Sequence, residues 1–193
     1  MSALESSYMD RSKWPAGEWD GEPDRVEWTD EDTRLTCLAH RGPSGHWCGY
    51  VAVPKGHPLW GTYYGDECDV LRDLVEARNN AEIGQVGPVN LLLMAMRGSA
   101  EPTPQDIIDV HGGLTYSDTG WRDLETCRGV YSSLIEDDGE LWWFGFDCAH
   151  AGDLRPEGGI DYGDGSYKTL EFVREQCRAL AAQLGALCEQ VQS

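Results

Sequence analysis

One short stretch of the chain joins a hydrophobic strand to ionisable side chains. Residues 142–146 read Trp-Trp-Phe-Gly-Phe, and Asp147, Cys148, His150 and Asp153 follow within seven residues. A strand that ends in polar groups is a common way to build a functional site, because the strand holds those groups rigidly. Carboxylate, thiol and imidazole groups at this point indicate metal binding, acid–base catalysis or nucleophilic attack.

Two more histidines are predicted to lie where a strand meets a loop. His57 stands between Gly56 and Pro58, and His111 precedes a pair of glycines. We expect these segments to meet the first stretch in one polar pocket. Its predicted catalytic residues are His57, His111, Asp147, His150 and Asp153.

Imidazole and carboxylate groups are suitable ligands for a divalent transition metal such as zinc or manganese. A turn over residues 148–152 would bring Asp147 and His150 to one side, where His111 would complete an open metal site. Asp153 would then be the spare carboxylate that acts as general base on a metal-bound water. The spacing matches no strong zinc motif, so a structural hydrogen-bonded cluster and a metal-free acid–base or binding site stay open as alternatives.

A second metal site is conceivable in the segment 37–48. Cys37 and His40 precede a turn, and His46 and Cys48 follow it, which is similar to zinc-ribbon chemistry. However, Cys37 and His40 are an odd number of residues apart, so a regular strand places them on opposite faces. The alternation therefore argues against this site.

Cys148 and His150 could also form a nucleophile pair, since both would lie on one face of a strand. The adjacent Asp147 would raise the thiol pKa, which disfavours that chemistry. Aromatic rings and backbone amides could contact a planar or phosphorylated ligand. The residues expected to bind it are Tyr50, Trp60, Gly112, Gly113 and Tyr116.

The net charge of the chain is −19, from 34 acidic and 15 basic residues. This balance disfavours direct binding of nucleic acid or of anionic membranes. It is compatible with a solvated surface, with an acidic surface for a protein partner, or with carboxylates that hold a cation. The chain shows neither a signal peptide nor a membrane-spanning apolar run, so we expect a cytoplasmic protein.

The order of predicted elements favours an α+β fold with a mainly antiparallel sheet. Residues 1–30 are predicted to be an irregular acidic arm with docked tryptophans. Residues 31–193 are predicted to be a single α+β domain with a helical insertion at about 66–105. The segments predicted as strands are 34–40, 47–53, 107–116, 131–135 and 141–146. The first two would form a hairpin over 34–53, and the last two would form a hairpin over 131–146.

The long C-terminal helix carries a continuous apolar stripe at spacings of three and four residues. The stripe consists of Leu170, Val173, Cys177, Leu180, Leu184, Leu187 and Val191. We expect the helix to pack across the sheet, with helix pairing in a homodimer as the alternative.

Three motifs together resemble a family of small uncharacterised bacteriophage and prophage proteins. They are Cys-Gly-Tyr-Val-Ala-Val-Pro-Lys-Gly-His-Pro-Leu at 48–59, Val-His-Gly-Gly-Leu-Thr-Tyr at 110–116 and Gly-Phe-Asp-Cys-Ala-His-Ala-Gly-Asp at 145–153. The resemblance covers roughly residues 22–65 and 106–190. It implies a phage-derived protein of the host cytoplasm, and it implies no catalytic residues.

The leading functional hypothesis is metal-assisted hydrolysis of a small nucleotide-like or phosphorylated molecule in the predicted pocket. One alternative is an anti-defence protein that sequesters a nucleotide-derived immune signal without turnover. The other is an acidic protein-interaction inhibitor that needs the charge and not the histidines.

Overall fold

The protein is described from a computed structural model. The described residues are 3–71, 102–123, 128–135, 140–158 and 165–191. Most of the predicted helical insertion at 66–105 lies outside them, although residues 69–71 are helical.

A six-stranded antiparallel sheet forms the body of the fold, in the order β1-β2-β3-β4-β8-β5. Its central strands are rich in β-branched and aromatic residues, which favour extended backbone. The strands are β1 (Leu4–Ser6), β2 (Arg25–Thr29), β3 (Thr36–Arg41), β4 (Trp47–Pro54), β5 (Tyr116–Asp118) and β8 (Leu141–Asp147). The expected α+β class with a mainly antiparallel sheet is confirmed.

Two small ribbons and one short helix accompany the sheet. These short elements of the described residues are α3 (Pro104–Ile107), β6 (Trp121–Asp123), β7 (Arg128–Val130), β9 (Asp153–Leu154) and β10 (Ser166–Tyr167). Strands β6 and β7 pair antiparallel, whereas β9 and β10 pair parallel.

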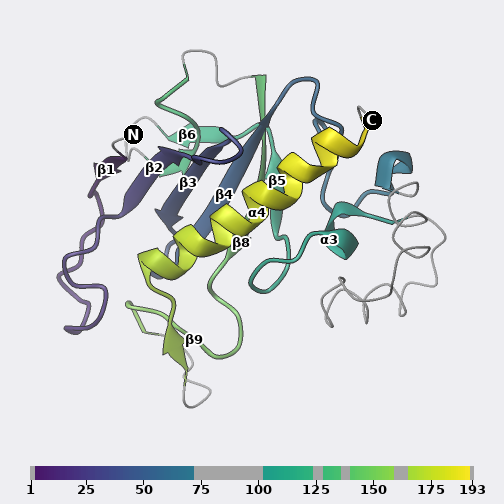
Figure 1. The fold of residues 1–193 in the computed structure, drawn as a ribbon. Coiled ribbons are helices and arrows are strands. Elements are labelled where there is room, and N and C mark those ends of the chain that lie inside the picture. Colours follow the sequence, from purple (N-terminus) through teal and green to yellow (C-terminus); the bar gives the residue numbers. More distant parts are fainter. Residues whose placement is uncertain (1–2, 72–101, 124–127, 136–139, 159–164, 192–193) are drawn as a thin grey trace.

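The C-terminal helix α4 (Leu170–Val191) lies diagonally across one face of the sheet (Figure 1). The predicted stripe is buried from Leu170 to Leu187 in one core cluster with the residues of β3, β4 and β8 that face α4. Burying each such side chain stabilises the fold by about 1.5–3 kcal/mol. The prediction that this helix packs on the sheet is therefore confirmed, and its pairing in a homodimer stays a prediction.

Gly49 explains how closely α4 approaches β4. A Cβ atom at this position would lie 2.5 Å from the ring of Phe146 and 2.8 Å from Sγ of Cys177. Any larger residue would push the helix away from the sheet, and the absence of a side chain here lets both surfaces meet.

The opposite face of the sheet carries a mixed polar and aromatic layer. Directly paired residues place Arg25, His40, Cys48 and Asp147 in one row across β2, β3, β4 and β8. The His40 ring stacks on Tyr50 at 5.1 Å, and burial lowers the pKa of His40 to about 4. His40 is therefore neutral at physiological pH and belongs to the core.

Three details of the predicted organisation are wrong. The supposedly irregular arm contains β1 and β2, although Trp19 is docked on the body as expected. Residues 107–116 do not form a strand, because α3 ends at Ile107 and a loop leads to β5. Residues 131–135 do not pair with β8, since its neighbours are β4 and β5.

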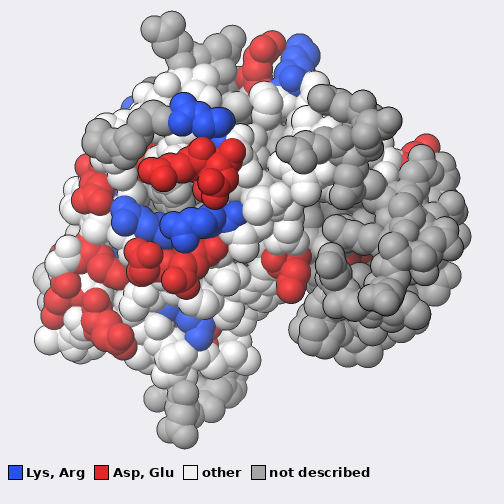
Figure 2. Space-filling model, in the orientation of Figure 1, with Lys and Arg blue, Asp and Glu red and all other residues white. Residues whose placement is uncertain are grey.

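Charged side chains of both signs alternate on the face that carries α4. Figure 2 shows Lys and Arg side chains lying between groups of Asp and Glu there. A shallow hollow on the surface combines Asp30, Glu31 and Asp32 with Arg174 and Arg178. This face is thus a mixed surface and not a continuous acidic one.

Within the part of the chain that the structure describes, there is no helix with the length and apolar character needed to cross a membrane.

Candidate metal centre

The turn after β8 brings two predicted site residues together. The Asp153 amide donates to the His150 carbonyl at 3.0 Å, and Gly152 has a φ of 89°, which suits glycine in a tight reversal. Ser166 of β10 then pairs with Asp153 of β9 and fixes the strand that follows the turn. The Asp153 side chain is consequently held back against His150.

The loop between α3 and β5 supplies the third residue. His111 Nε2 lies 3.1 Å from Oδ1 and 2.9 Å from Oδ2 of Asp153. Ligand atoms of His111, His150 and Asp153 all lie within 4.8 Å of one another. Two imidazoles and one carboxylate so arranged could hold a metal ion.

The His150 ring has one buried nitrogen without a partner. Its Nδ1 atom makes no hydrogen bond to the described residues, and it lies 3.5 Å from Oδ2 of Asp153 and 3.9 Å from Oδ1 of Asp147. The backbone amide of His150 donates to Asp153 at 3.0 Å. Leaving a buried polar atom unpaired costs about 1–3 kcal/mol, so a bound cation fits this position.

Gly112 allows the His150 ring to sit against the loop. A Cβ atom on Gly112 would lie 2.1 Å from Cε1 of His150, and the φ of Gly112 is 71°. Both the close contact and the left-handed backbone require glycine. The neighbouring Gly113 also has a positive φ, of 87°, but a Cβ there would meet nothing within 4 Å.

The first turns of α4 form one wall of the centre. The His111 amide donates to Oε1 of Gln176 at 2.9 Å, and the Phe172 ring lies edge-on to the His111 ring at 5.3 Å. The Lys168 ammonium, just before α4, is 3.6 Å from Oδ1 of Asp153. The wall therefore holds the imidazole and adds one positive charge.

The charge state of Asp153 is determined by the groups around its carboxyl. Burial by itself would raise the pKa of this carboxyl, whose side chain is only 3% exposed. The hydrogen bonds from His111 and from the His150 amide, together with the charges of His111 and Lys168, outweigh burial and lower the pKa of Asp153. The carboxylate is thus ionised at neutral pH, as a metal ligand must be.

Asp147 does not belong to the group of three, although it was predicted as a metal ligand. As the last residue of β8 it pairs with Cys48, on the face of the sheet opposite α4. His111, by contrast, packs against α4. Asp147 therefore lies at the edge of the group, with its Oδ1 3.9 Å from Nδ1 of His150, and Asp153 takes the ligand position predicted for Asp147.

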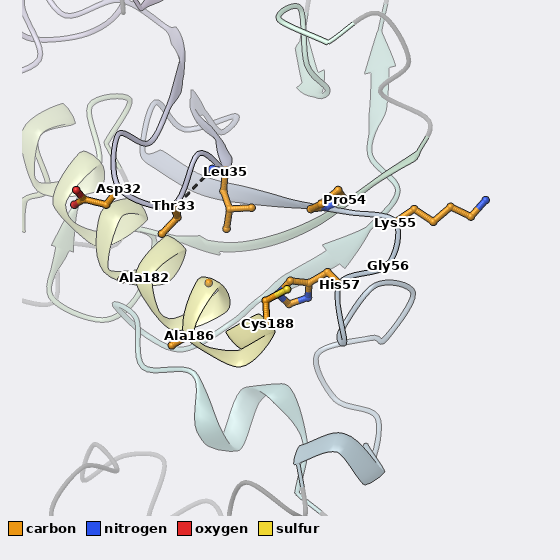
Figure 3. Close-up of a pocket in the computed structure, with 11 residues that line it drawn as sticks. Asp32, Thr33, Leu35, Pro54, Lys55, Gly56, His57, Ala182, Ala186 and Cys188 are labelled. Atoms are coloured by element: carbon orange, nitrogen blue, oxygen red, sulfur yellow. Dashed lines mark hydrogen bonds between the residues drawn. The ribbon is translucent and has the colours of Figure 1, made fainter. Parts of the chain in front are cut away.

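His57 is not part of this centre. Its Nε2–H donates to the Leu184 carbonyl at 2.9 Å, and its Nδ1 accepts from the Leu59 amide at 3.1 Å. Leu184 is eight residues beyond Gln176, which corresponds to about 12 Å along a helix. Figure 3 shows His57 beside Cys188, at the other half of α4. Both residues line a groove of about 650 Å³.

The aromatic residues predicted to bind a ligand are not gathered at the centre either. Tyr50 packs edge-on to Tyr116 at 5.3 Å on the face opposite α4. Trp60 lies beside Trp142, with its indole N–H donating to the Glu140 carbonyl at 2.8 Å. Of the predicted ligand-binding set, Gly112 contacts His150 directly and Gly113 lies next to it in the loop.

The two thiol alternatives fit the structure poorly. Cys37 lies in the core under α4, whereas His40 and Cys48 are paired on the other face, as the alternation predicted. Cys148 is buried, and its pKa is raised by that burial and by the charge of Asp153. A buried thiol that resists ionisation is a poor nucleophile.

Sequence reasoning missed Lys168, Phe172 and Gln176. They lie on or next to α4, where Phe172 and Gln176 fall outside the apolar stripe. Nothing in their spacing indicated a common site with His111, because the contact depends on how α4 crosses the sheet.

Comparison of the chain with protein-family models, with curated proteins and with solved structures finds no match.

Proposed function

We propose that this protein is a metal-dependent hydrolase of a small phosphorylated or nucleotide-like molecule. His111, His150 and Asp153 would hold zinc or manganese, which accept imidazole and carboxylate ligands. The observation that carries the proposal is the buried, unpaired Nδ1 of His150 beside an ionised carboxylate and a second imidazole. Three protein ligands leave a position open for water, as in catalytic metal sites.

A divalent cation in such a site supplies a water molecule with a pKa near neutrality. Asp147 is the candidate base, because its side chain is partly exposed and its Oδ1 lies 3.9 Å from Nδ1 of His150. In the proposed reaction Asp147 accepts a proton from the attacking water, whose oxygen bonds to phosphorus. The bond from phosphorus to the leaving oxygen breaks, and that oxygen takes a proton from solvent. The two aspartates thus exchange the roles predicted from the sequence.

Lys168 supports an anionic substrate. Its ammonium donates to the Ser166 hydroxyl at 2.7 Å and lies 3.6 Å from Asp153. In a chain with a net charge of −19, a cation beside the centre gives a phosphate group a local partner. Its charge would pair with substrate once a cation occupies the Asp153 carboxylate.

Metal content and turnover test the proposal together. We expect about one equivalent of metal in protein purified without chelator, and hydrolysis of at least one member of a panel of nucleotides and phosphate esters. The His111→Ala/His150→Ala double variant should lose both while keeping its fold by circular dichroism. Asp147→Asn should keep the metal and lower kcat by about 10²-fold or more, as expected for loss of a general base.

The outcomes separate the alternatives. Binding of a nucleotide without turnover would favour sequestration of a nucleotide-derived signal, and the motifs that resemble phage proteins suit either role in an infected cell. A wild-type protein that takes up neither zinc nor manganese would contradict the metal-dependent mechanism.

A further inference from the structure

The carboxylate of Glu22, in the segment before β2, accepts hydrogen bonds from four groups. Its side chain is 17% exposed and accepts from both sheet and C-terminal elements. The donors are Nη2 of Arg41 at 2.7 Å, Nε1 of Trp47 at 3.0 Å, the Tyr167 hydroxyl at 2.5 Å and the Leu170 amide at 2.8 Å. One carboxylate therefore joins β3 and β4 to β10 and the start of α4.

Two of these bonds fix the short link between β10 and α4. The Tyr167 hydroxyl binds Oε2 of Glu22, and the Leu170 amide binds Oε1. Lys168 lies between these two anchor points in the chain. The Tyr167 ring is also held edge-on to Trp19, at 5.3 Å, so the link cannot shift without breaking several contacts.

The same link touches the candidate metal centre on two sides. Ser166 pairs with Asp153 across β9 and β10, and its amide donates to the Gly152 carbonyl at 2.9 Å. The Lys168 ammonium lies 3.6 Å from the Asp153 carboxylate. A movement of the link would therefore be passed directly to the carboxylate of the centre.

The start of α4 carries a second connection. The Leu170 amide is one of the four N–H groups that a helix leaves unpaired at its first turn, and Glu22 satisfies it. Phe172 follows within this turn and packs against His111. Glu22 is thus connected to Asp153 through Tyr167 and β10, and to His111 through the first turn of α4. It contacts neither residue directly.

We infer that Glu22 is a positioning residue for the metal centre, acting through Tyr167 on Asp153 and through α4 on His111. The inference rests on the proposed function, because it takes this centre to be the metal site. Groups behind the ligands of a metal typically change its affinity by about 10–100-fold when they are altered.

The test compares Glu22→Gln with Asp24→Asn in the full chain. Asp24 is a matched control, since it is a fully buried carboxylate of the same segment that also contacts Arg41. Its other side-chain partners are the Tyr8 and Met9 amides and the Arg11 guanidinium, none of which belongs to β10 or α4. Arg11 also donates to the backbone carbonyl of Glu22, which Glu22→Gln leaves in place. Zinc affinity would be measured by competition with a chromogenic chelator.

We expect Glu22→Gln to raise the Kd for zinc by about 10-fold or more, and Asp24→Asn by less than about threefold. Tyr167→Phe removes the hydroxyl that donates to Glu22 and accepts from Arg41 but keeps the ring against Trp19, so a smaller increase is expected. An unchanged Kd in Glu22→Gln, or an equal increase in both carboxylate variants, would overturn the inference.

A second measurement needs no metal. Hydrogen exchange of the Ser166 amide, which is bonded to Gly152, should become faster in Glu22→Gln and stay slow in Asp24→Asn. If the wild type binds no zinc, the proposed function fails, and this exchange rate still decides whether Glu22 holds β10 against Asp153. Equal protection of Ser166 in wild type and Glu22→Gln would refute the positioning role.

Discussion

Histidines lie beside both halves of α4, and the two groups differ in the hydrogen-bond partners of their ring nitrogens. Near the C-terminal half, both ring nitrogens of His57 are bonded to backbone groups, at 2.9 and 3.1 Å. Near the N-terminal half, His111 faces a carboxylate and Nδ1 of His150 is buried without a hydrogen bond. An imidazole whose nitrogens are both used by the backbone belongs to the fold, whereas an unpaired nitrogen is available to a ligand.

The two regions also differ in charge, because one holds a neutral imidazole and the other an ionised carboxylate. Burial lowers the pKa of His57, although its hydrogen bond to Leu184 acts in the opposite direction, so the ring is neutral. At the other half, Asp153 stays ionised between His111 and Lys168. One region is a neutral scaffold, and the other keeps a negative charge that a cation can neutralise.

The largest effect is expected from removing that charge. Asp153→Asn should weaken zinc binding by at least about 100-fold, because it replaces the one carboxylate of the three ligands. His57→Ala should keep about one equivalent of metal, as measured by elemental analysis after gel filtration. Loss of the metal in His57→Ala would erase the distinction between the two regions.

A smaller effect is expected from the loop behind His150. In Gly112→Ala the new Cβ would collide with the His150 ring, so metal affinity should fall by about 10-fold or more. Gly113→Ala is the matched control, since it has the same kind of backbone strain without the collision. Titration of both variants with zinc measures the difference, and equal affinities would show that the His150 ring can move freely.

Stability should respond in the opposite order. His57→Ala leaves the Leu184 carbonyl and the Leu59 amide without their partner, at a cost of about 1–3 kcal/mol for each. His150→Ala removes a nitrogen that is already unpaired, so in the presence of chelator it should cost less than about 1 kcal/mol. Urea denaturation of the two variants provides the test, and a greater loss in His150→Ala would contradict our account.

The smallest effect concerns pH. The pKa of His57 is lowered from its usual 6.5 in the folded protein, so the unfolded chain takes up the proton first as pH falls. The stability that His57 contributes is therefore complete above about pH 6.5 and declines below it. The difference in unfolding free energy between wild type and His57→Ala should narrow from pH 7.5 to pH 5. A difference that widens would mean that the folded state favours the charged ring.

Periodicity predicted much of the fold. The stripe from Leu170 to Leu187 and the alternation in β3 and β4 depend on local spacing, which the sequence displays directly. The prediction of a strand over residues 107–116 failed because Val110 and Leu114 are buried, as they would be in a strand, although they belong to a loop. Local pattern cannot distinguish a buried loop from a short strand when both contribute apolar side chains.

The candidate site was predicted in part. His111, His150 and Asp153 were all named, yet the roles of Asp147 and Asp153 depended on which face the last residue of β8 occupies. In the sequence His57 looked equivalent to His111, because each is next to a glycine at a predicted strand end. His57 follows Gly56, and His111 precedes Gly112. Only the tertiary structure shows which backbone groups reach their ring nitrogens.

The bond between Glu22 and the Leu170 amide joins residues that are 148 positions apart. During synthesis the N-terminal segment leaves the ribosome long before α4 is made, so Glu22 cannot find this partner until translation is well advanced. Contacts between distant residues also form slowly. Until α4 arrives, the apolar face of β3, β4 and β8 is exposed to solvent and offers a binding surface to chaperones. A nascent chain stalled before α4 would already hold His111, His150 and Asp153 but would lack Phe172 and Gln176, so the candidate metal centre would be missing the wall that contacts His111.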